Sequence, residues 1–126
     1  MPRLSSAETR IVRSMLGERF GLGSPLVAQV ERLQIRPRHM TGVGYWVDFQ
    51  NPTDVQRSSI SNTELSEDYR TKRKAPLDMV GFTLFIRDGY PSSLEGYTYG
   101  DVAWPDEPME EWLILDRVET PHQKTK

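Results

Sequence analysis

The chain has 126 residues, no cysteine, two histidines and a formal net charge of −2. This length corresponds to about one domain, and the missing cysteines exclude disulfides, thiolate metal sites and cysteine nucleophiles. Since no apolar run reaches the roughly 18 residues of a membrane span and no basic-then-apolar leader opens the chain, the sequence predicts a single soluble, cytoplasmic domain over residues 1–126.

The small net charge conceals a gradient along the chain. Residues 1–40 have a net charge of +4, residues 41–75 are neutral, and residues 76–126 have a net charge of −6. Two interpretations fit: the two ends lie side by side and attract each other, or the acidic half faces a charged partner. Nucleic acid is disfavoured as a partner because it binds a positive surface, and only the cluster between residues 32 and 39 offers one.

The first predicted element is a helix over residues 5–20. Ser5 and Glu8 have the spacing of a capping box, in which each side chain binds a free backbone amide of the first turn. Apolar residues recur with helical spacing and form one stripe, which consists of Leu4, Ile11, Val12, Met15, Leu16 and Phe20. Gly21 ends the helix, and Ser24-Pro25 begins a second, short turn.

Two segments with alternating hydrophobicity follow. Residues 30–36 alternate apolar and polar side chains and predict a strand. Residues 43–49 predict a second strand, with Trp46 and Asp48 on the face opposite the apolar residues. The short connection between these segments predicts that they pair as an antiparallel hairpin.

The segment 51–78 is polar and holds few apolar residues. Leu65 and Tyr69 lie four positions apart, which suggests one short helix over residues 63–70. Long loops without secondary structure are uncommon in compact domains and are usually functional or disordered. The sequence therefore predicts a mobile excursion with one helical turn, and a surface loop without a function is the alternative.

The remaining chain predicts further strands. Residues 79–86 carry apolar side chains on both faces, as a central strand does. Asp88-Gly89 is a hairpin signal, and Pro91, which donates no ladder hydrogen bond, favours a four-residue connection over 88–91. The elements that follow are, in order, a return strand over 92–99, an acidic loop over 101–108, a last strand over 111–118 and a disordered tail over 119–126.

These elements predict an α+β fold in which the N-terminal helix packs on a mostly antiparallel sheet of about five strands. Established catalytic motifs are missing. The glycine pairs at 21–23 and 42–44 complete no phosphate loop, no serine sits in a GxSxG elbow, and the acidic loop lacks calcium-loop spacing. His39 and His122 are poorly placed for a triad. We expect no cofactor and no metal, and a binding protein more than an enzyme.

Strand carboxylates offer the one enzymatic option. Asp48, Asp88 and Glu95 lie on or beside predicted strands, and a pair of facing carboxylates performs glycoside hydrolysis. Glu95 is therefore a candidate pocket carboxylate. The competing interpretation is an ion pair between Arg87 and Glu95 across the hairpin, which stabilises a sheet modestly.

Aromatic and acidic residues are interleaved in the C-terminal half of the chain. Burial in the core is the commonest role for such aromatic residues. Tyr and Trp also carry much of the binding energy at protein interfaces, and a rim of carboxylates steers a basic partner. The predicted partner-binding residues are Tyr97, Tyr99, Trp104, Asp106 and Glu107.

Three short blocks resemble a group of small uncharacterised bacterial proteins. The blocks are Thr41-Gly-Val-Gly-Tyr-Trp-Val-Asp-Phe49, Gly81-Phe-Thr-Leu-Phe-Ile-Arg-Asp-Gly89 and Leu94-Glu-Gly-Tyr-Thr-Tyr-Gly100 with Trp104-Pro105. The resemblance implies no activity, cofactor or catalytic residue, and the polar segment 51–78 departs from the pattern. The last block is also similar to segments in some bacterial toxin-immunity proteins, which by analogy favours an inhibitor.

Three functional hypotheses follow from the sequence. The first is a non-enzymatic protein-binding domain, with an immunity-type inhibitor as one form of it. The second is a small-ligand-binding or hydrolytic domain that uses Glu95 with Tyr97 and Tyr99. The third is a structural subunit that self-associates through a sheet edge.

Overall fold

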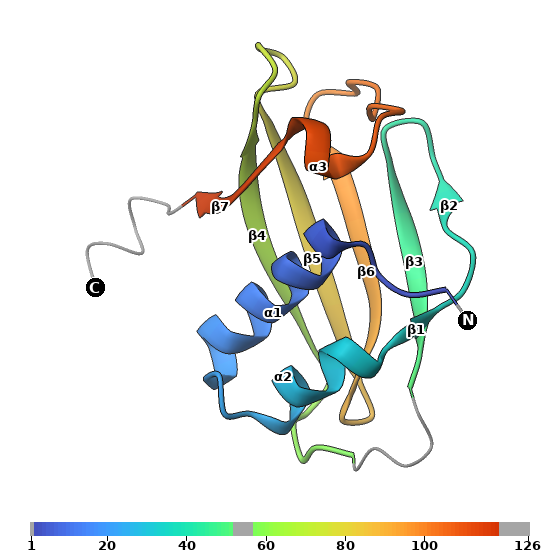
Figure 1. Ribbon diagram of the computed structural model, residues 1–126, viewed down its shortest axis with the longest axis vertical. Coiled ribbons are helices and arrows are strands. Elements are labelled where there is room, and N and C mark those ends of the chain that lie inside the picture. The colour runs from blue at the N-terminus through green and yellow to red at the C-terminus, as the bar shows by residue number, and fades with distance from the viewer. Residues whose placement is uncertain (1, 52–56, 119–126) are drawn as a thin grey trace.

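The computed structural model describes residues 2–51 and 57–118 and has an α+β fold, as the sequence predicts. In chain order the elements are α1 (Ser6–Phe20), α2 (Pro25–Gln29), a 3-10 turn η1 (Val30–Arg32), β1 (Gln34–Ile35), β2 (His39–Met40), β3 (Gly44–Gln50), β4 (Thr63–Thr71), β5 (Met79–Arg87), β6 (Tyr90–Thr98), α3 (Met109–Trp112) and β7 (Leu113–Val118). Figure 1 shows α1 and α2 lying on one face of the sheet.

The sheet is antiparallel throughout its described pairs. Its strand order is β1-β3-β6-β5-β4-β7, and β2 pairs with β3 as well. The predicted central position of residues 79–86 is confirmed, because β5 lies between β6 and β4. The sheet order thus brings the N-terminal strands β1 to β3 beside β6 and leaves β7 at the opposite edge.

The predicted N-terminal helix is confirmed, together with its capping box. The Glu8 N–H donates to the Ser5 hydroxyl at 3.1 Å, and the Ser5 N–H donates to the Glu8 carboxylate at 2.9 Å. Gly21 ends the helix with a φ of 88°, a conformation that side chains with a Cβ rarely adopt. The middle of the apolar stripe of α1 is buried against the sheet, whereas Leu4 and Phe20 at its ends are partly buried.

The core lies between α1 with α2 and the inner face of the sheet. Inner-face residues come from alternate positions of β3, β5 and β6, because successive side chains of a strand point to opposite faces. The most deeply buried members of this set are Val47, Val80, Phe82, Leu84, Ile86 and Leu94. Burial of this face fixes the register of each strand, since a shift by one residue would expose it.

The prediction of a helical turn over residues 63–70 is wrong, because these residues belong to β4. Leu65 and Tyr69 are four positions apart, and this even spacing places them on one face of a strand as well as on one face of a helix. Thr71 continues the buried row, and β4 pairs with β5 from Thr63 to Arg70. The polar excursion is therefore shorter than predicted. Its residues 52–56 lie outside the described part of the chain.

The strand predicted over residues 30–36 is only partly formed, because Val30–Arg32 form η1 instead. The Ser24 hydroxyl caps α2, and η1 continues the helical turns to Arg32, so that only Gln34–Ile35 form a strand. The predicted antiparallel pairing with β3 is confirmed for these two residues. Ser24-Pro25 is thus the stronger local signal in this segment.

Two further boundaries differ from the sequence prediction. The hairpin between β5 and β6 has a two-residue turn, in which Asp88 and Gly89 have φ values of 53° and 80°. Pro91 lies inside β6 next to a register shift, and this bulge accommodates the proline without a longer loop. Near the C-terminus, α3 includes Trp112, so the last strand begins at Leu113.

Candidate functional site

The face of the sheet opposite α1 and α2 is the first candidate site. Among the described residues no helix covers this face, which we call the helix-free face. The registers of β3, β6, β5 and β4 arrange its side chains in rows across the sheet. One row is Trp46, Glu95, Thr83 and Ser66, and the next is Gly44, Tyr97, Gly81 and Asp68.

Tyr97 lies between two glycines in its row, and this explains how its ring is placed. A Cβ on Gly81 would lie 2.5 Å from Cε2 of Tyr97, so the ring covers the space that a side chain at this position would fill. Such packing of an aromatic ring over a strand glycine restores some of the packing that glycine lacks. The Tyr97 hydroxyl lies 3.3 Å from the Thr83 hydroxyl, which in turn lies 2.8 Å from the Ser66 hydroxyl.

Tyr99 crosses the helix-free face to reach β4. Its hydroxyl donates to the Asp68 carboxylate, and its ring packs edge-on against Tyr97 with centroids 5.7 Å apart. Partial burial, together with the hydrogen bond to Asp68, raises the pKa of Tyr99 above the usual 10.0, so the phenol stays neutral. The ring nevertheless remains 42% exposed.

Trp46 of β3 adds a third aromatic ring to Tyr97 and Tyr99 on the helix-free face, next to Glu95. It is 39% exposed and stacks on the His39 ring with centroids 4.7 Å apart and an interplanar angle of 16°. Because Trp46 and Glu95 lie directly opposite each other in the β3–β6 register, their side chains are neighbours on the same face. The sequence placed Trp46 on the face opposite Tyr45, but it did not show that Glu95 and Tyr97 lie beside it.

A cavity of about 210 Å³ opens beside Glu95. Gly44 packs closely against β6, where a Cβ would lie 2.2 Å from the Gly96 carbonyl oxygen. The residues that line the cavity are Thr41, Val43, Gly44, Tyr45, Trp46, Glu95, Gly96 and Tyr97, and of these Tyr45 directs its ring to the inner face. Aromatic walls and a carboxylate are the groups that hold a cation, because the ring faces and the carboxylate both attract positive charge.

The predicted partner-binding residues do not form one surface. Tyr97 and Tyr99 lie on the helix-free face with the candidate pocket carboxylate Glu95. Trp104 is 9% exposed and packs edge-on against Tyr45, Phe82 and Trp112 in the core. Aromatic residues in this segment therefore divide between the two faces of the sheet.

Asp106 and Glu107 are exposed and lie away from the two tyrosines, on the helix side of the molecule. The Arg73 guanidinium donates to Glu107 at 2.7 Å and lowers the pKa of that carboxyl. Arg73, which follows β4, thus pairs with the acidic loop at Glu107.

The predicted ion pair between Arg87 and Glu95 is wrong. The β5–β6 register places Glu95 opposite Thr83 and Arg87 opposite Tyr90. Arg87 instead donates to the Thr63 carbonyl at 3.0 Å, pairs with Glu64 at 3.4 Å and lies over the ring of Phe85. The bulge near Pro91 shifts the pairing of β5 with β6 by one residue, and the position of this bulge cannot be read from the sequence.

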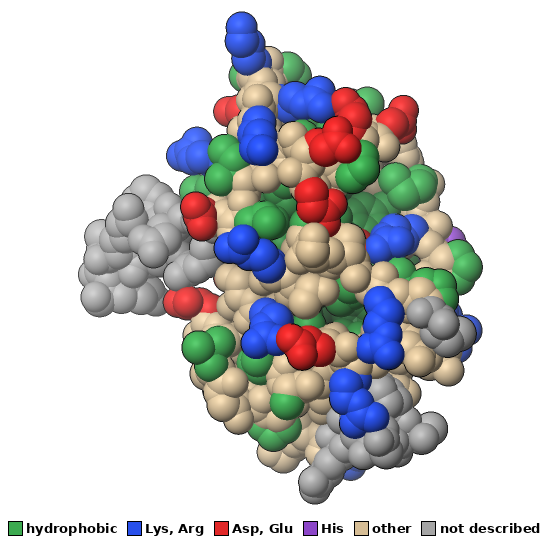
Figure 2. All heavy atoms as spheres, in the orientation of Figure 1, with side chains coloured by type: hydrophobic (Ala, Val, Ile, Leu, Met, Phe, Trp, Pro, Cys, Tyr) green, Lys and Arg blue, Asp and Glu red, His purple; other side chains and the backbone are tan. Residues whose placement is uncertain are grey.

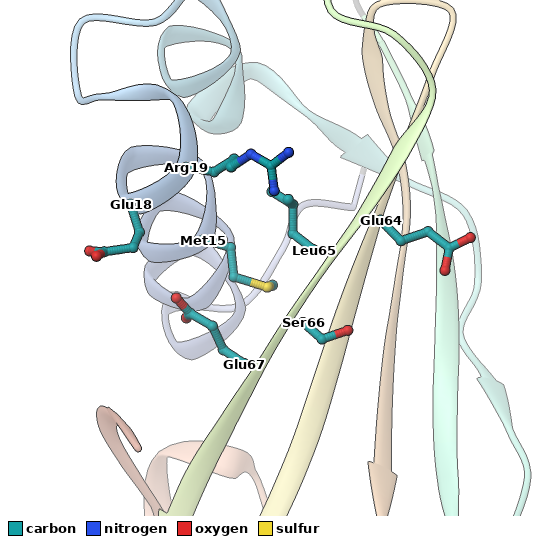
Figure 3. A pocket seen from close by; sticks show the side chains of 7 residues that line it. All are labelled: Met15, Glu18, Arg19, Glu64, Leu65, Ser66 and Glu67. Atoms are coloured by element: carbon teal, nitrogen blue, oxygen red, sulfur yellow. The ribbon is translucent and has the colours of Figure 1, made fainter. Parts of the chain in front are cut away.

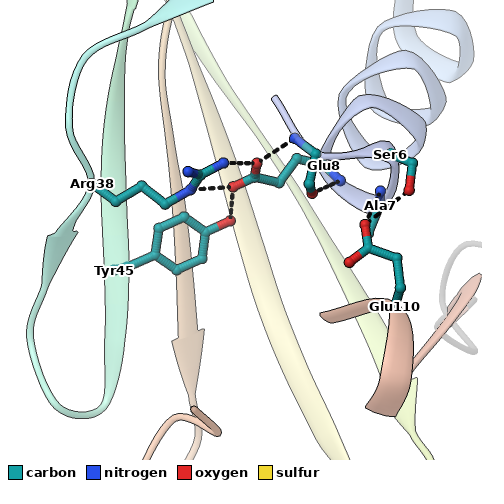
Figure 4. Close-up of polar contacts among 7 residues, drawn as sticks. Ser6, Ala7, Glu8, Arg38, Tyr45 and Glu110 are labelled. Carbon is teal, nitrogen blue, oxygen red and sulfur yellow. Dashed lines mark hydrogen bonds and ion pairs between the residues drawn. The ribbon is translucent and has the colours of Figure 1, made fainter. Parts of the chain in front are cut away.

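A second cluster, on the helix side, holds the fully buried carboxylate of Glu8 (Figure 4). Arg38 donates to both oxygens of Glu8, with Nε at 3.1 Å from Oε2, and the Tyr45 hydroxyl donates to Oε2 at 2.7 Å. Desolvation, followed by the nearby Glu8 charge, raises the pKa of Tyr45 well above its usual value. With the Ser5 N–H on Oε1, both carboxylate oxygens are satisfied.

Glu8 also lines a cavity of about 250 Å³ with Trp104, Met40 and the acidic loop. Figure 2 shows a hollow with apolar lining between α3 and β2, and the close-up shows Glu110 at the start of α1. Glu110 accepts hydrogen bonds from the Ser6 hydroxyl and the Ala7 N–H, both at 2.9 Å. Because these carboxylates are engaged in joining α1, β3 and α3, we assign the cluster to the fold.

Comparisons with known proteins give no further assignment. No family model, no curated protein and no solved structure matches the chain. Among the described residues no group of three or more His, Asp or Glu side chains is arranged to hold a metal ion. Within the same residues no helix has the length and apolar character needed to cross a membrane.

Proposed function

We propose that this chain is a non-enzymatic protein-binding domain of the immunity-inhibitor type, whose partner presents a basic segment to the helix-free face. The observation that carries the proposal is the exposure of Trp46 and Tyr99 beside the carboxylates of Glu95 and Asp68. Exposed apolar surface that is rimmed by polar residues marks interaction sites, and Trp and Tyr dominate binding energy at interfaces.

The cavity beside Glu95 suits one cationic side chain of the partner. Trp46 and Tyr97 supply aromatic faces, and the carboxylate of Glu95 supplies the compensating charge. An Arg or Lys side chain inserted here gains a cation–π contact and an ion pair in a partly desolvated place. Asp48 and Asp68 lie on the same face and add to the negative potential that steers a basic partner.

The helix-free face is held in place before any partner arrives. The hydroxyls of Tyr97, Thr83 and Ser66 form a row, and Tyr99 is tied to Asp68. Ordered side chains lose little conformational freedom on binding, which favours affinity. This arrangement fits a binding surface whose shape is already formed.

Two other hypotheses are weaker on this geometry. A hydrolytic site needs a second carboxylate, and the residues directly opposite Glu95 are Trp46 and Thr83. Asp48 is diagonal to Glu95, and residues so placed are about 7–8 Å apart, which excludes the closely spaced retaining pair and leaves only the wider inverting one. Self-association through a sheet edge, the third hypothesis, leaves the exposure of Trp46 and Tyr99 unexplained.

A ligand titration by NMR tests the cavity. We expect N-acetyl-arginine amide to shift the Trp46 indole and Val43 signals, N-acetyl-glutamine amide to leave them unchanged, and Glu95→Gln to remove the effect. Shifts of equal size with both compounds, or shifts spread evenly over the molecule, would reject a cation site. Sedimentation equilibrium should show a monomer, and a dimer lost on Trp46→Ala would favour self-association instead.

A further inference from the structure

Two carboxylates of the helix-free face, those of Asp48 on β3 and Glu95 on β6, have no partner. Both residues are half-buried, and among the described residues neither side chain accepts a hydrogen bond or forms an ion pair. Arg36 approaches Asp48 through its backbone, whose N–H donates to the Asp48 carbonyl at 3.0 Å, but its guanidinium forms no ion pair with the carboxylate. Partial burial of an unpaired charge costs free energy, which a bound cation would recover.

The groove between α1 and β4 also holds carboxylates, but the chain itself supplies their partners (Figure 3). Glu67, which points toward α1, accepts hydrogen bonds from the Tyr69 hydroxyl at 2.6 Å and the Ser14 hydroxyl at 3.3 Å. Glu64, on the other face of β4, pairs with Arg87 at 3.4 Å. We therefore look for the contacts of a basic partner at Asp48 and Glu95 and not in this groove.

The β3–β6 register fixes the spacing of the two unpaired carboxylates. Glu95 lies directly opposite Trp46, and Asp48 lies two residues farther along β3, opposite Ser93. Asp48 and Glu95 are therefore diagonal neighbours on one face, and residues so placed are about 7–8 Å apart. Trp46 is next to both of them.

An extended peptide places its alternate side chains at nearly the same spacing. Its residues advance by about 3.3 Å each, so that alternate side chains lie on one face about 6.7 Å apart. Adjacent side chains of such a peptide point to opposite faces. Two cations separated by one residue can therefore meet Asp48 and Glu95 at once, whereas two adjacent cations cannot.

We infer that the basic segment of the partner binds in an extended form with cations at alternate positions, one in the cavity beside Glu95 and the next on Asp48. This inference rests on the function proposed above and adds the residue spacing that the partner must have. Trp46 and Glu95 line the cavity that receives the first cation. Asp48 lies beyond this cavity along β3, where its carboxylate accepts charge-assisted hydrogen bonds from the second.

A second copy of the chain is a poorer occupant, although its own run Lys72-Arg73-Lys74 has cations at alternate positions. This run lies in the bend after β4 and is not extended. The Lys72 N–H donates to the Trp112 carbonyl at 2.7 Å, and Arg73 pairs with Glu107 at 2.7 Å. These contacts hold the run in place within its own chain, which favours a segment from a different protein.

The test compares two peptides of equal composition and charge, acetyl-Thr-Arg-Thr-Arg-Thr-amide and acetyl-Thr-Arg-Arg-Thr-Thr-amide. Threonine favours an extended backbone in both. We expect the alternating peptide to bind about fivefold more tightly in an NMR titration that follows the Trp46 indole signal, because only this peptide pairs both carboxylates. Equal affinities of the two peptides would overturn the inference.

Two variants of the chain give a matched test of Asp48. Asp48→Asn should reduce the affinity of the alternating peptide to that of the adjacent one. Glu64→Gln removes the same charge from the same face, but at a carboxylate that Arg87 already pairs, and should keep the preference. A preference that survives Asp48→Asn, or one that Glu64→Gln removes as well, would overturn the role of Asp48.

N-acetyl-arginine amide, which has one cation, separates this inference from the proposed function. Its binding should be removed by Glu95→Gln and unchanged by Asp48→Asn. If it binds while the two peptides bind equally, the spacing is wrong and the cation site stands. If none of the three compounds binds, both proposals fail. Concentration-dependent self-association that Asp48→Asn abolishes would assign the site to a second copy and overturn the inference.

Discussion

The Tyr45 hydroxyl donates a 2.7 Å hydrogen bond to the Glu8 carboxylate, joining β3 to the first turn of α1 in the interior. Arg38 binds the same carboxylate from the connection between β1 and β2. The residue that caps the helix is thus also the acceptor that holds the helix to the sheet. This double role makes Glu8 the polar centre of the N-terminal half.

Removal of the Glu8 side chain should cost more stability than removal of the Tyr45 hydroxyl. Glu8→Ala leaves the Arg38 guanidinium and the Tyr45 hydroxyl without their acceptor and should lower the free energy of unfolding by about 3 kcal/mol. Tyr45→Phe removes one hydrogen bond and should cost about 1 kcal/mol. Urea unfolding followed by circular dichroism measures both, and equal losses would contradict the central role of Glu8.

Acid should weaken the contact between α3 and α1. Burial raises the pKa of Glu110, but hydrogen bonds from Ala7 and Ser6 outweigh it and lower the pKa from the ordinary 4.5. Because the pKa of Glu110 is lower in the folded chain than in the unfolded chain, the ionised carboxylate stabilises the fold at any pH above the unfolded-state pKa. This stabilisation is lost as the pH falls through the folded-state pKa.

Glu110→Gln should therefore lower stability at neutral pH and reduce the stability loss between neutral pH and about pH 3. Glu111→Gln, a change at an exposed neighbour, serves as the control. Urea midpoints measured across this range check the prediction. Identical pH profiles for the parent chain and Glu110→Gln would show that Glu110 contributes nothing to acid sensitivity.

Gly96 should tolerate no side chain. A Cβ at this position would lie 2.7 Å from the Tyr45 ring, 2.9 Å from the Phe82 ring and 3.0 Å from the Trp104 ring. All three rings are buried, so Gly96→Ala should cost about 1–3 kcal/mol through overpacking. Gly23→Ala, where nothing lies within 4 Å of the new methyl group, is the matched control. Equal thermal midpoints for the two variants would contradict the packing described.

The fold was predictable where local signals agree with one another. The capping box at Ser5 and Glu8 and the two apolar faces of residues 79–86 gave the helix and the central strand correctly. The helical turn predicted over residues 63–70 was wrong because the four-residue spacing of Leu65 and Tyr69 fits one face of a helix and one face of a strand equally well. Only the pairing of this segment with β5 decides between the two. Tertiary context outweighs weak local preference in such a segment.

The candidate site was predictable only in part, for a related reason. The even spacing of Glu95, Tyr97 and Tyr99 predicts that they share one face of a strand, and in the structure all three lie on the helix-free face. Trp46 lies beside them only because the β3–β6 register places it opposite Glu95. Trp104 lies on the other face of the sheet, where its ring packs over Gly96. Contacts between distant strands depend on topology, which sequence spacing does not encode.

The central claim, that a basic partner binds the helix-free face, is tested most directly by photo-crosslinking in the native cell. A benzoyl-phenylalanine at position 99 should capture one discrete basic protein, and Trp46→Ala should abolish the cross-link. The same group at position 22, where Leu22 is 78% exposed, is the control and should capture nothing discrete. No discrete product from position 99, or the same product from both positions, would contradict the account.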